Sequence, residues 1–484
     1  MQNVEELISK LKNPSSEDKA LIRKAFDFAA RTHAGQMRFS GEPYFIHCFT
    51  VAVNLAELGM DVRTIAAGLL HDTIEDAGIP TKTLESEFGK DISFLVEGVT
   101  KLGKLKYHGE TRHVESLRKL FIATTKDIRV LIIKLADRLH NASTLQHVRL
   151  DKQKRIALET LEIYAPIANR FGMGQVRHLL EEYAFPYAYP EEYKQTRDLM
   201  KRKRDEIEER LEKFYRTLKK ELAEAGHKNV ITSNRTKGTY SLYKKLLRYD
   251  MDISKIYDLM AIRVIVPNVA DCYGVLGVIH GHYRPLPGRI KDYIAFPKPN
   301  GYQSLHTTIF TGDGGIIEIQ VRTEDMHEEA EKGIASHLGY KEGINKNTTN
   351  PGQISKKYDW FRQLVELQKN VSETGEFLQH LTMDFFENRV FVFTPKGDVI
   401  DLPQGASPVD FAFAVHSDIG MHASGAKVNG KFTSLATELR NGDIVEIETR
   451  KNVVPTRKWL DYAKTTLAKR HIRATLVEQR EKKI

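Results

Sequence analysis

The chain contains little cysteine, little tryptophan and no long apolar run. Its two cysteines, Cys48 and Cys272, lie far apart, so they give neither a disulfide framework nor a zinc-binding spacing, which fits a reducing cytoplasmic compartment. No run approaches the roughly 20 apolar residues that a membrane span needs, and the N-terminal MQNVEELISKLKN lacks the apolar stretch of a signal peptide. The sequence therefore predicts a cytoplasmic protein with no membrane partner.

The length and the charge are those of a multidomain globular protein. At 484 residues the chain exceeds one ordinary core, and about three domains of ~150 residues each are expected. The net charge of +9 fits nucleotide or nucleic-acid binding, but a mild excess of lysine on solvated helices gives the same total. The positions of the basic residues have to decide between the two interpretations.

Apolar periodicity divides the chain into a helical first part and a mixed second part. Up to about Leu180, apolar residues recur every three or four positions, as in IAAGLLHDTIEDA and VLIIKLADRLHN, and predict nearly continuous helix. A charged helical connector follows and stops near Gly226. The β-branched runs AIRVIVP, VLGVIHGHY, TTIFTG and GIIEIQVRT then predict strands of an α/β domain.

The last part of the chain is predicted to hold a polar linker and a small β-rich module. GINKNTTNPGQ is rich in turn residues, and a helical pair containing Trp360 and Phe386 follows it. RVFVFTPKGDVIDLP predicts a hairpin that turns at Pro395, Lys396 and Gly397, and GAKVNGK and GDIVEIET complete a compact sheet with one helix. The tail RKWLDYAKTTLAKRHIRATL predicts a basic amphipathic helix.

Imidazole and carboxylate side chains stand out in the helical first part. His47, the adjacent pair His71 and Asp72, and Asp137 lie in largely apolar helical segments, where such groups must be satisfied or functional. Together they suit a divalent first-row metal such as manganese, which activates water for hydrolysis. An HD dipeptide alone is weak evidence, but the ordered set H…HDxxED…LADRLHN favours a metal site over scattered polar residues.

Two carboxylates and two neutral polar residues follow these ligands at helical spacing. Side chains four positions apart share a helix face, so Glu75 and Asp76 are predicted to lie on the metal-facing side as general acid or base or as supports for the ligands. On the third helix, Asn141 and Thr144 follow Asp137 by one and two turns and are predicted to line the same cleft.

Charged residues also gather in the α/β part. Glu318 shares one strand face with the other polar residues of IIEIQVRT, and Asp258 stands just before AIRVIV, so two neighbouring strands can hold Mg²⁺ against nucleotide phosphates. Tyr302 can stack on a base, and His306 can reach a phosphate. The absence of GxxxxGK[ST] excludes a P-loop enzyme. Taken singly, the surrounding cations fit a solvated face, but jointly they suit phosphoryl transfer. They are Arg235, Lys237, Lys245, Arg289 and Lys291.

These motifs resemble those of the long RelA/SpoT homologues, the (p)ppGpp synthetase/hydrolases of the bacterial stringent response, over most of the chain. SGEPYFIH, HDTIED and KLADRLHN resemble the family's HD-type hydrolase, and RTKGTYSLYKK, PGRIKDYIAFPKPNGYQSLHT and IEIQVRTEDMHEEAEKGIASH its synthetase. VFTPKGDVIDLP and GAKVNGK resemble its TGS domain, a ubiquitin-like β-grasp module. The implied organisation is an all-α HD-type hydrolase domain (1–190), a helical connector (191–228), an α/β nucleotidyltransferase-like synthetase domain (229–342), a linker with helices (343–387), the TGS domain (388–449) and the start of a helical regulatory region (450–484).

The resemblance implies a bifunctional enzyme with a GTP pyrophosphokinase activity and a (p)ppGpp 3′-pyrophosphohydrolase activity. The synthetase would transfer pyrophosphate from ATP to the 3′-hydroxyl of GDP or GTP and release AMP, and the hydrolase would return GDP or GTP and pyrophosphate. The implied hydrolase roles are Mn²⁺ binding by His47, His71, Asp72 and Asp137, handling of water by Glu75 and Asp76, and nucleotide contact by Arg38, Asn141 and Thr144.

The resemblance also assigns roles in the synthetase and the TGS domain. Asp258 and Glu318 would carry Mg²⁺, with Glu318 activating the acceptor hydroxyl. Tyr302 would stack on guanine, and His306 would orient phosphate. His416 matches a position that meets the end of uncharged tRNA in ribosome-bound relatives, although GMHASGA differs from the usual two-histidine version. The residues that would grip ATP and the departing phosphates are Arg235, Lys237, Ser241, Lys245, Arg289 and Lys291.

Two positions and the end of the chain depart from the family pattern. Phe39 follows Arg38 where a second basic residue is common, and Ser143 stands where arginine is frequent, so altered nucleotide affinity is expected rather than lost activity. Long relatives continue through helical, zinc or RNA-recognition-like and ACT modules, so weakened docking to the ribosome is expected here.

The sequence leaves three functions open. The leading hypothesis is a bifunctional enzyme whose two sites are mutually exclusive and are switched by movement between the domains. The nearest alternative is a hydrolase-dominant protein with a weak synthetase. A catalytically inactive ribosome- or tRNA-binding regulator would require losses at Asp72, Asp258 or Glu318, and all three residues are present.

Overall fold

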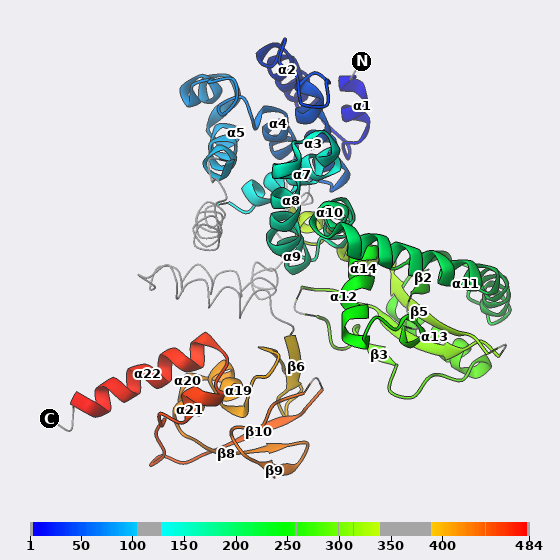
Figure 1. Cartoon of the computed structure of the whole chain (residues 1–484), viewed down its shortest axis with the longest axis vertical. Helices are drawn as coiled ribbons and strands as arrows, with labels where there is room; N and C mark the ends of the chain where they lie inside the picture. The colour runs from blue at the N-terminus through cyan, green and yellow to red at the C-terminus, as the bar shows by residue number, and fades with distance from the viewer. Residues whose placement is uncertain are drawn as a thin grey trace. The chain divides into compact units, whose positions relative to one another are not determined.

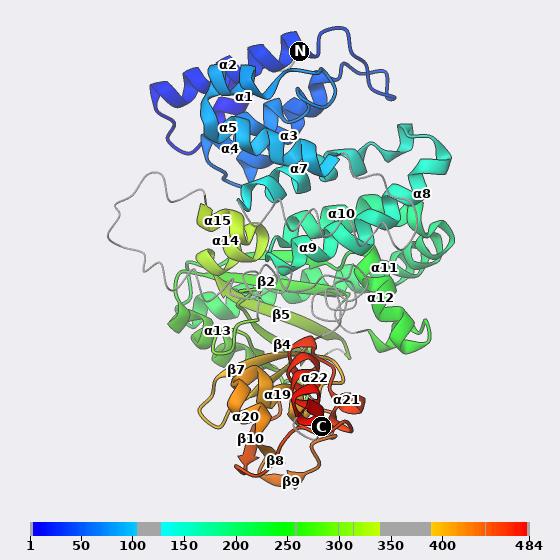
Figure 2. The ribbon, with the colours of Figure 1, turned by 90° about the vertical axis from the view of Figure 1, so that its left-hand side faces the viewer.

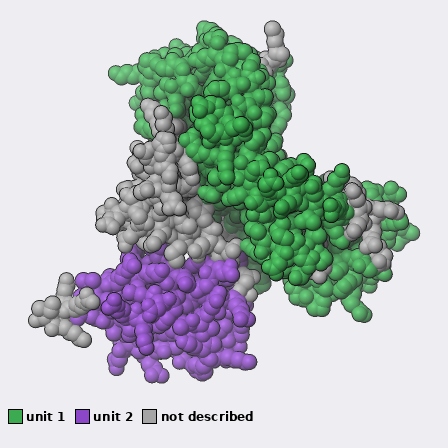
Figure 3. Space-filling view, in the orientation of Figure 1, with its two compact units in different colours: residues 1–107, 119–365 green, residues 108–118, 366–484 purple. Residues whose placement is uncertain are grey.

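The computed structural model describes residues 3–103, 127–256, 259–298, 300–312, 314–338, 389–440 and 442–481. The described residues fall into two compact units, coloured green and purple in Figure 3. The first unit holds the described residues up to 338 and the second holds those from 389 onward. The predicted polar linker and the helical pair with Trp360 and Phe386 lie outside the described residues.

The first unit begins with a helical part, blue to cyan in Figure 1, as the apolar periodicity predicted. Its elements are α1 (Val4–Ser9), α2 (Ser16–Thr32), α3 (Phe45–Glu57), α4 (Val62–Leu70), α5 (Thr81–Gly103), α7 (Arg129–Ser143), η1 (Leu145–His147), α8 (Leu150–Glu159), the π-helical η2 (Thr160–Tyr164), α9 (Ala165–Arg170) and α10 (Gly174–Ala188).

The centre of this part is formed by α3, α4 and α7, with α3 packed against both others. Apolar side chains such as Val51, Leu69 and Leu131 are fully buried there, because they repeat on one face of each helix. A Cβ atom on Gly68 would lie 2.4 Å from Leu55 Cδ1, so glycine permits α3 and α4 to approach closely at this point. That close approach lies three residues before the HD pair.

The helix that contains the HD pair is shorter than predicted. α4 ends at Leu70 with His71 as its C-cap, and the residues that follow form turns before Gly78, whose φ is +69°. One helix-like bond remains, from Asp76 N to Asp72 O at 2.9 Å. The helical-face argument for Glu75 and Asp76 was therefore wrong, because these carboxylates lie in turns rather than on a helix.

The long helix α11 leads into a mixed α/β part, and Gly226, with φ of +95°, follows its end as predicted. The elements are α11 (Pro190–Glu224), β1 (Ile231–Thr236), α12 (Thr239–Leu246), η3 (Leu247–Tyr249), η4 (Ile253–Lys255), β2 (Met260–Val266), α13 (Val269–His282), β3 (Lys291–Asp292), β4 (Leu305–Phe310), β5 (Ile316–Thr323), α14 (Glu324–Lys332) and α15 (Ile334–Leu338).

The five strands form one mixed sheet in the order β1-β2-β5-β4-β3, with β2 and β5 parallel and the other pairs antiparallel. Figure 2 shows β2, β5 and β4 following one another in this order. One face is apolar: Ile317, Ile319 and Val321 of β5 are buried against side chains of α11 and α13. Because side chains alternate along a strand, Glu318 and Gln320 lie on the opposite face, as predicted.

The strand prediction for VLGVIHGHY was wrong, since this run forms the second half of α13. Asn268 caps the helix by accepting a hydrogen bond from Asp271 N, and Cys272, Val275 and Ile279 then fall on one helical face that is fully buried against the sheet. Tertiary burial at helical spacing overrode the β preference of the branched side chains.

The second unit is a small β-rich module with helices. It comprises β6 (Arg389–Phe393), β7 (Val399–Pro403), α19 (Pro408–Val415), α20 (Ser417–Met421), β8 (Ala423–Val428), β9 (Lys431–Thr433), β10 (Val445–Thr449), α21 (Trp459–Tyr462) and α22 (Thr466–Glu481). β6 and β7 form the predicted hairpin around Gly397, β8 pairs with β9 and β10, and a parallel bridge joins Phe393 to Ile444.

The tail is not the single helix that its periodicity predicted. The buried carboxylate of Asp410 accepts hydrogen bonds from the backbone N–H groups of Lys464 and Thr465, which lie between α21 and α22. Trp459 and Ile472 are buried in one cluster with residues of α19, so these tail helices complete the core of the module.

Candidate active sites

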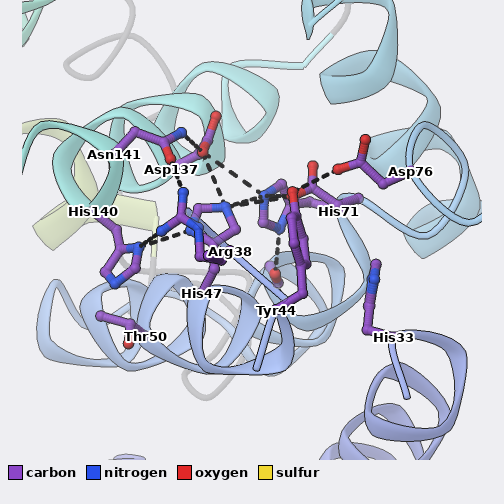
Figure 4. Close-up of polar contacts among 12 residues, drawn as sticks. His33, Arg38, Tyr44, His47, Thr50, His71, Asp76, Asp137, His140 and Asn141 are labelled. Atoms are coloured by element: carbon purple, nitrogen blue, oxygen red, sulfur yellow. Dashed lines mark hydrogen bonds and ion pairs between the residues drawn. The ribbon is translucent and has the colours of Figure 1, made fainter. Parts of the chain in front are cut away.

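Three segments of the helical part bring imidazole and carboxylate atoms together. α3 supplies His47, the end of α4 supplies His71 and Asp72, and α7 supplies Asp137; Figure 4 shows the side chains of His47, His71 and Asp137 turned toward one another. His47 Nε2 lies 3.2 Å from His71 Nε2, 3.2 Å from Asp137 Oδ1 and 3.4 Å from Asp72 Oδ2. The four residues predicted as metal ligands therefore converge on one point.

The convergence fits a divalent cation. His47, His71 and Asp137 are at least 96% buried, and their candidate ligand atoms all lie within 4.8 Å of one another. Donor atoms held by bonds of about 2.0–2.2 Å around one ion are separated by roughly 3 to 3.5 Å, which matches this spacing. A second group of Cys48, His71 and Asp72 meets the same criterion, but its thiol is far less suited to a hard cation than the carboxylate of Asp137.

The electrostatics of the cluster also favour a positive charge at its centre. Burial alone would lower the pKa of His71, but the charge and hydrogen bond of Asp72 raise this pKa to about 9. Burial would likewise raise the pKa of Asp137, but Lys134, with its Nζ 2.7 Å from Asp137 Oδ2, and His47 hold that pKa well below its usual range. A divalent cation bound at the centre would supply such a charge.

Hydrogen bonds from outside the cluster orient the two histidines. His71 Nδ1 donates to Gly68 O at 2.8 Å, so its Nε2 is the ring atom that faces the carboxylates. His47 Nδ1 lies 2.8 Å from Nδ1 of His140 on α7. Such contacts fix the ring orientation of metal-binding histidines. His140 was not among the predicted residues, although it stands in the KLADRLHN motif that carries Asp137.

A tyrosine joins the HD pair to the next carboxylate. The Tyr44 hydroxyl lies 2.8 Å from Asp72 Oδ2 and 2.5 Å from Asp76 Oδ2. Burial and these two carboxylates raise the pKa of Tyr44, so it remains a neutral donor. Partial burial raises the pKa of Glu75 against the opposing charge of Lys134. Both predicted carboxylates thus lie beside the cluster, and Tyr44 is a further site residue that the prediction missed.

The predicted nucleotide contacts of the hydrolase lie on the other side of His47. Arg38 Nη1 is 2.9 Å from His140 Nδ1, and its other terminal nitrogen donates to Asn141 Oδ1. Asn141 in turn donates to Asp137. The Thr144 hydroxyl donates to the backbone oxygen of His140 at the end of α7. Arg38 and Asn141 are thus joined to the cluster, whereas Thr144 caps its own helix.

The two departures from the motif pattern differ in their surroundings. The Phe39 side chain is 76% exposed next to Arg38, and the Ser143 hydroxyl donates to the backbone of His140 at 2.8 Å. Within the described part of the chain, neither of these two side chains forms a hydrogen bond with the four predicted metal ligands.

In the α/β part, one cavity is lined by half of the predicted synthetase residues, and further ones lie next to it. It is lined by Lys245, Tyr249, Lys255, Arg289, Lys291, His306, Thr308 and Glu318. His306 Nδ1 lies 3.4 Å from Glu318 Oε1, and Tyr302 Oη lies 2.8 Å from His306 Nε2. Arg235 Nη1 reaches the same face by donating to Gln320 Oε1, while Gln320 Nε2 donates to Glu318.

Three predicted synthetase residues are not part of this gathering. Asp258 lies outside the described residues, so the proposed pair of carboxylates is represented by Glu318 alone. Lys237 is placed by its backbone bond to Leu259 O and does not line the cavity. The Ser241 hydroxyl donates to Glu181 of α10 at 2.9 Å.

Lys298 is a cation that the prediction missed, although it stands in PKPNGYQSLHT. Its Nζ lies 4.5 Å from the ring centre of Tyr293 and 4.9 Å from that of Tyr302. Burial lowers its pKa to about 8, helped by the charges of Lys291, Arg177 and Arg235. Lys291, Arg177 and Arg235 thus add positive charge around this ammonium, which suits the binding of a phosphate.

Comparison with known proteins identifies three domains along the chain. Residues 25–174 match the HD domain, residues 234–345 match a region found in RelA/SpoT proteins, and residues 390–449 match the TGS domain. The guanosine-3′,5′-bis(diphosphate) 3′-pyrophosphohydrolase of Aquifex aeolicus is 45% identical over 478 residues, which cover 99% of this chain and 67% of that relative. The chain belongs to the RelA/SpoT family.

Other RelA/SpoT relatives carry names for either or both activities. The GTP pyrophosphokinase of Myxococcus xanthus is 44% identical over 473 residues, covering 96% of this chain and 61% of that protein. The bifunctional (p)ppGpp synthase/hydrolase SpoT of Escherichia coli is 43% identical over 456 residues, covering 94% and 64%. The chain spans about 61 to 67% of the length of these three relatives.

Membership of the RelA/SpoT family confirms the predicted fold classes. The HD-domain match coincides with the helical part and the RelA/SpoT match with the mixed sheet, and the TGS match covers β6 to β10. The HD match and the buried donor cluster together imply a divalent metal in the first site. No described helix is long and apolar enough to cross a bilayer.

In the TGS part, His416 stands between α19 and α20. Its side chain is 62% exposed, and its Nδ1 accepts a hydrogen bond from Asp418 N at 3.2 Å. The residue is therefore available at the surface of its own unit.

Proposed function

We propose that this chain both makes and removes a guanosine 3′-pyrophosphate, using Mg²⁺ in the synthetase domain and Mn²⁺ in the HD domain. The observation that carries the proposal is the presence, on one chain, of a buried His and Asp cluster and of a separate cationic cavity that contains Glu318. The substrates are ATP with GDP or GTP in one direction and (p)ppGpp in the other.

In the hydrolase, His47, His71, Asp72 and Asp137 would hold the ion, which would lower the pKa of water when bound. Glu75 and Asp76 lie beside the cluster and are placed to take a proton from water and to return one to the leaving 3′-oxygen. The water oxygen forms a bond to the phosphorus that carries the 3′-oxygen. The bond between this phosphorus and the 3′-oxygen breaks, which gives pyrophosphate and a free 3′-hydroxyl. Arg38 and Asn141 hold the nucleotide, whose anionic groups complement the guanidinium.

In the synthetase, Glu318 accepts the proton of the acceptor 3′-hydroxyl. The 3′-oxygen then bonds to the β-phosphorus of ATP, and AMP departs with the oxygen that bridged the α- and β-phosphorus atoms. Arg235, Lys245, Arg289 and Lys291 neutralise the charge that develops on the phosphates. Tyr302 stacks on guanine, and its hydroxyl holds His306 in place beside Glu318.

One contact between the two domains would oppose ATP binding in this conformation. The N-terminus of α12 follows the RTKG segment that we assign to ATP, and a helix N-terminus attracts anions. Here Glu182 of α10 occupies that position: its carboxylate accepts from Thr239 N at 2.6 Å and from the Thr239 hydroxyl at 3.0 Å. ATP phosphates would compete with this carboxylate, which supports mutually exclusive activities.

We further propose that the TGS domain contacts the end of uncharged tRNA through the exposed His416. The TGS match and the surface position of this histidine support the proposal.

The decisive experiment compares Asp72→Asn and Glu318→Gln in two assays, with Asp151→Asn and Glu324→Gln as exposed acidic controls. Purified protein is incubated with labelled ATP and GDP, or with ppGpp and Mn²⁺. Asp72→Asn should abolish hydrolysis alone, and Glu318→Gln should abolish synthesis alone. A wild-type protein without turnover in either assay would refute the proposal, and hydrolysis without synthesis would favour the hydrolase-dominant alternative.

A further inference from the structure

One buried ring stands between the metal cluster and the predicted nucleotide contacts. The His140 side chain, which is only 9% exposed on α7, has its Nδ1 2.8 Å from His47 Nδ1 and 2.9 Å from Arg38 Nη1 (Figure 4). A predicted metal ligand and a predicted nucleotide contact therefore meet at a single nitrogen atom.

The direction of both hydrogen bonds follows from chemistry. A guanidinium only donates, so His140 Nδ1 accepts from Arg38 and carries no proton. The remaining contact then has one direction: His47 Nδ1–H donates to His140. A neutral imidazole protonated at Nδ1 presents its lone pair at Nε2, and His47 Nε2 is the atom that faces Asp72, Asp137 and His71 within 3.4 Å.

We propose that His140 is a positioning residue of the HD centre and that it couples metal binding at His47 to nucleotide binding at Arg38. The inference rests on the proposed hydrolase function. A neutral imidazole has one lone pair in its ring plane, and in this structure two donors share it. When Arg38 turns toward a phosphate, the lone pair of His140 Nδ1 accepts a hydrogen bond from His47 alone.

The coupling has a definite sign. A stronger hydrogen bond from His47 Nδ1–H makes Nε2 a better donor to a cation, so nucleotide engagement by Arg38 tightens the metal. Linkage requires the reverse as well: a bound metal favours the state in which Arg38 is released from His140 and engages the nucleotide. The other histidine, His71, is not coupled to nucleotide binding in this way. Its Nδ1 donates to the backbone oxygen of Gly68, and no described side chain competes for that oxygen.

The test measures Mn²⁺ binding to the metal-stripped full chain by the electron paramagnetic resonance signal of free Mn²⁺, without any turnover. His140→Phe keeps a ring of similar size but removes the acceptor, and its Mn²⁺ affinity should fall about 10- to 100-fold, as for other groups that orient metal ligands. His140→Asn places an amide oxygen near the position of Nδ1 and should restore most of the affinity.

Arg38→Met gives an independent test that leaves the buried ring in place. This variant removes the competing donor, so its Mn²⁺ affinity should equal or exceed that of the wild type while its affinity for GDP falls. A loss of Mn²⁺ affinity as large as that of His140→Phe would overturn the coupling, as would an Asn variant no better than the Phe variant.

Asp72→Asn separates this inference from the proposed function. If the wild type does not bind Mn²⁺ more tightly than Asp72→Asn, the metal site itself fails. If the wild type does bind and His140→Phe binds equally well, the site stands and the role of His140 is refuted. Two measurements report whether each variant is folded. One is thermal unfolding, and the other is synthesis from ATP and GDP, which uses another domain.

Discussion

The two sites of this chain differ in how their charges are balanced. In the HD cluster, each ligand lies within 4 Å of an opposite or orienting group, and at least 96% of His47, His71 and Asp137 is buried. In the synthetase cavity, the cations Lys245, Lys255, Arg289 and Lys291 line one cavity together with a single acidic residue, Glu318.

This difference matches the ligands that we propose for each site. Buried charges are costly unless they are paired, so the HD cluster must be nearly complete before any substrate arrives. A site for two nucleotides needs room and a cationic excess, because its substrates carry the compensating negative charge. We therefore expect substitutions in the HD domain to affect chemistry and substitutions in the synthetase domain to affect substrate binding more strongly.

The largest expected effect is at Glu75. Glu75→Gln removes a proton acceptor beside the HD cluster but no ligand, so hydrolysis should fall by about 10²- to 10⁴-fold in kcat. Mn²⁺ affinity should stay near the wild-type value. Glu85→Gln, an exposed acid on α5, is the control. Steady-state hydrolysis of ppGpp checks the prediction; a change in KM alone would contradict a role in proton transfer.

The next effect is at Lys298, the partly buried cation beside Tyr293 and Tyr302. Lys298→Met should weaken nucleotide binding in the synthetase by about 10- to 150-fold, the range for a charge-assisted hydrogen bond. Hydrolysis should not change. Calorimetric titration with ATP, GDP and GTP measures the loss, with the exposed Lys228→Met as control. Equal affinities in the two variants would show that Lys298 serves packing only.

A smaller effect is expected from pH. Because burial holds the pKa of Lys298 at about 8, its ammonium is present below pH 8 and is lost above it. Nucleotide phosphates favour the charged form, so affinity should be constant near pH 7 and fall by at most about tenfold per pH unit above pH 8. Binding measured from pH 7 to 9.5 tests this. The Lys298→Met variant should give a flat profile, and a slope in that variant would assign the titration elsewhere.

The smallest effect concerns the contact between the domains. Glu182→Gln removes the negative charge at the N-terminus of α12, so ATP should bind about two- to fivefold more tightly, as expected for 0.3–1 kcal/mol at a helix end. The rate of synthesis should rise with it. Glu191→Gln at the start of α11 is a matched control. Weaker ATP binding in Glu182→Gln would show that the carboxylate supports α12 instead of competing with ATP.

Much of the fold was predictable because the periodicities are local. The helices of the first part, the polar face of β5 and the hairpin around Gly397 all follow from spacing along one segment. VLGVIHGHY was assigned to the wrong structure because its branched residues suit a strand, while its burial against the sheet at helical spacing was not visible. The tail was predicted as one helix because the caps supplied by Asp410 come from a distant segment.

In the candidate sites too, some features follow from the local sequence and others depend on how the helices pack. His47, His71, Asp72 and Asp137 were predictable as residue types in ordered motifs, and the structure brings them together. The distances between them and the partners that orient them depend on how α3, α4 and α7 pack. His140 and Tyr44 were missed for this reason, although both stand inside the motifs that were recognised.

The sequence by itself determined which elements form and which residue types can carry phosphate and metal chemistry, because these depend on local spacing and side-chain chemistry. The tertiary structure alone decided that His140 lies within hydrogen-bond distance of both His47 and Arg38 and that Glu182 reaches the N-terminus of α12. Such contacts join segments dozens of residues apart, and only the packing of the helices fixes their geometry.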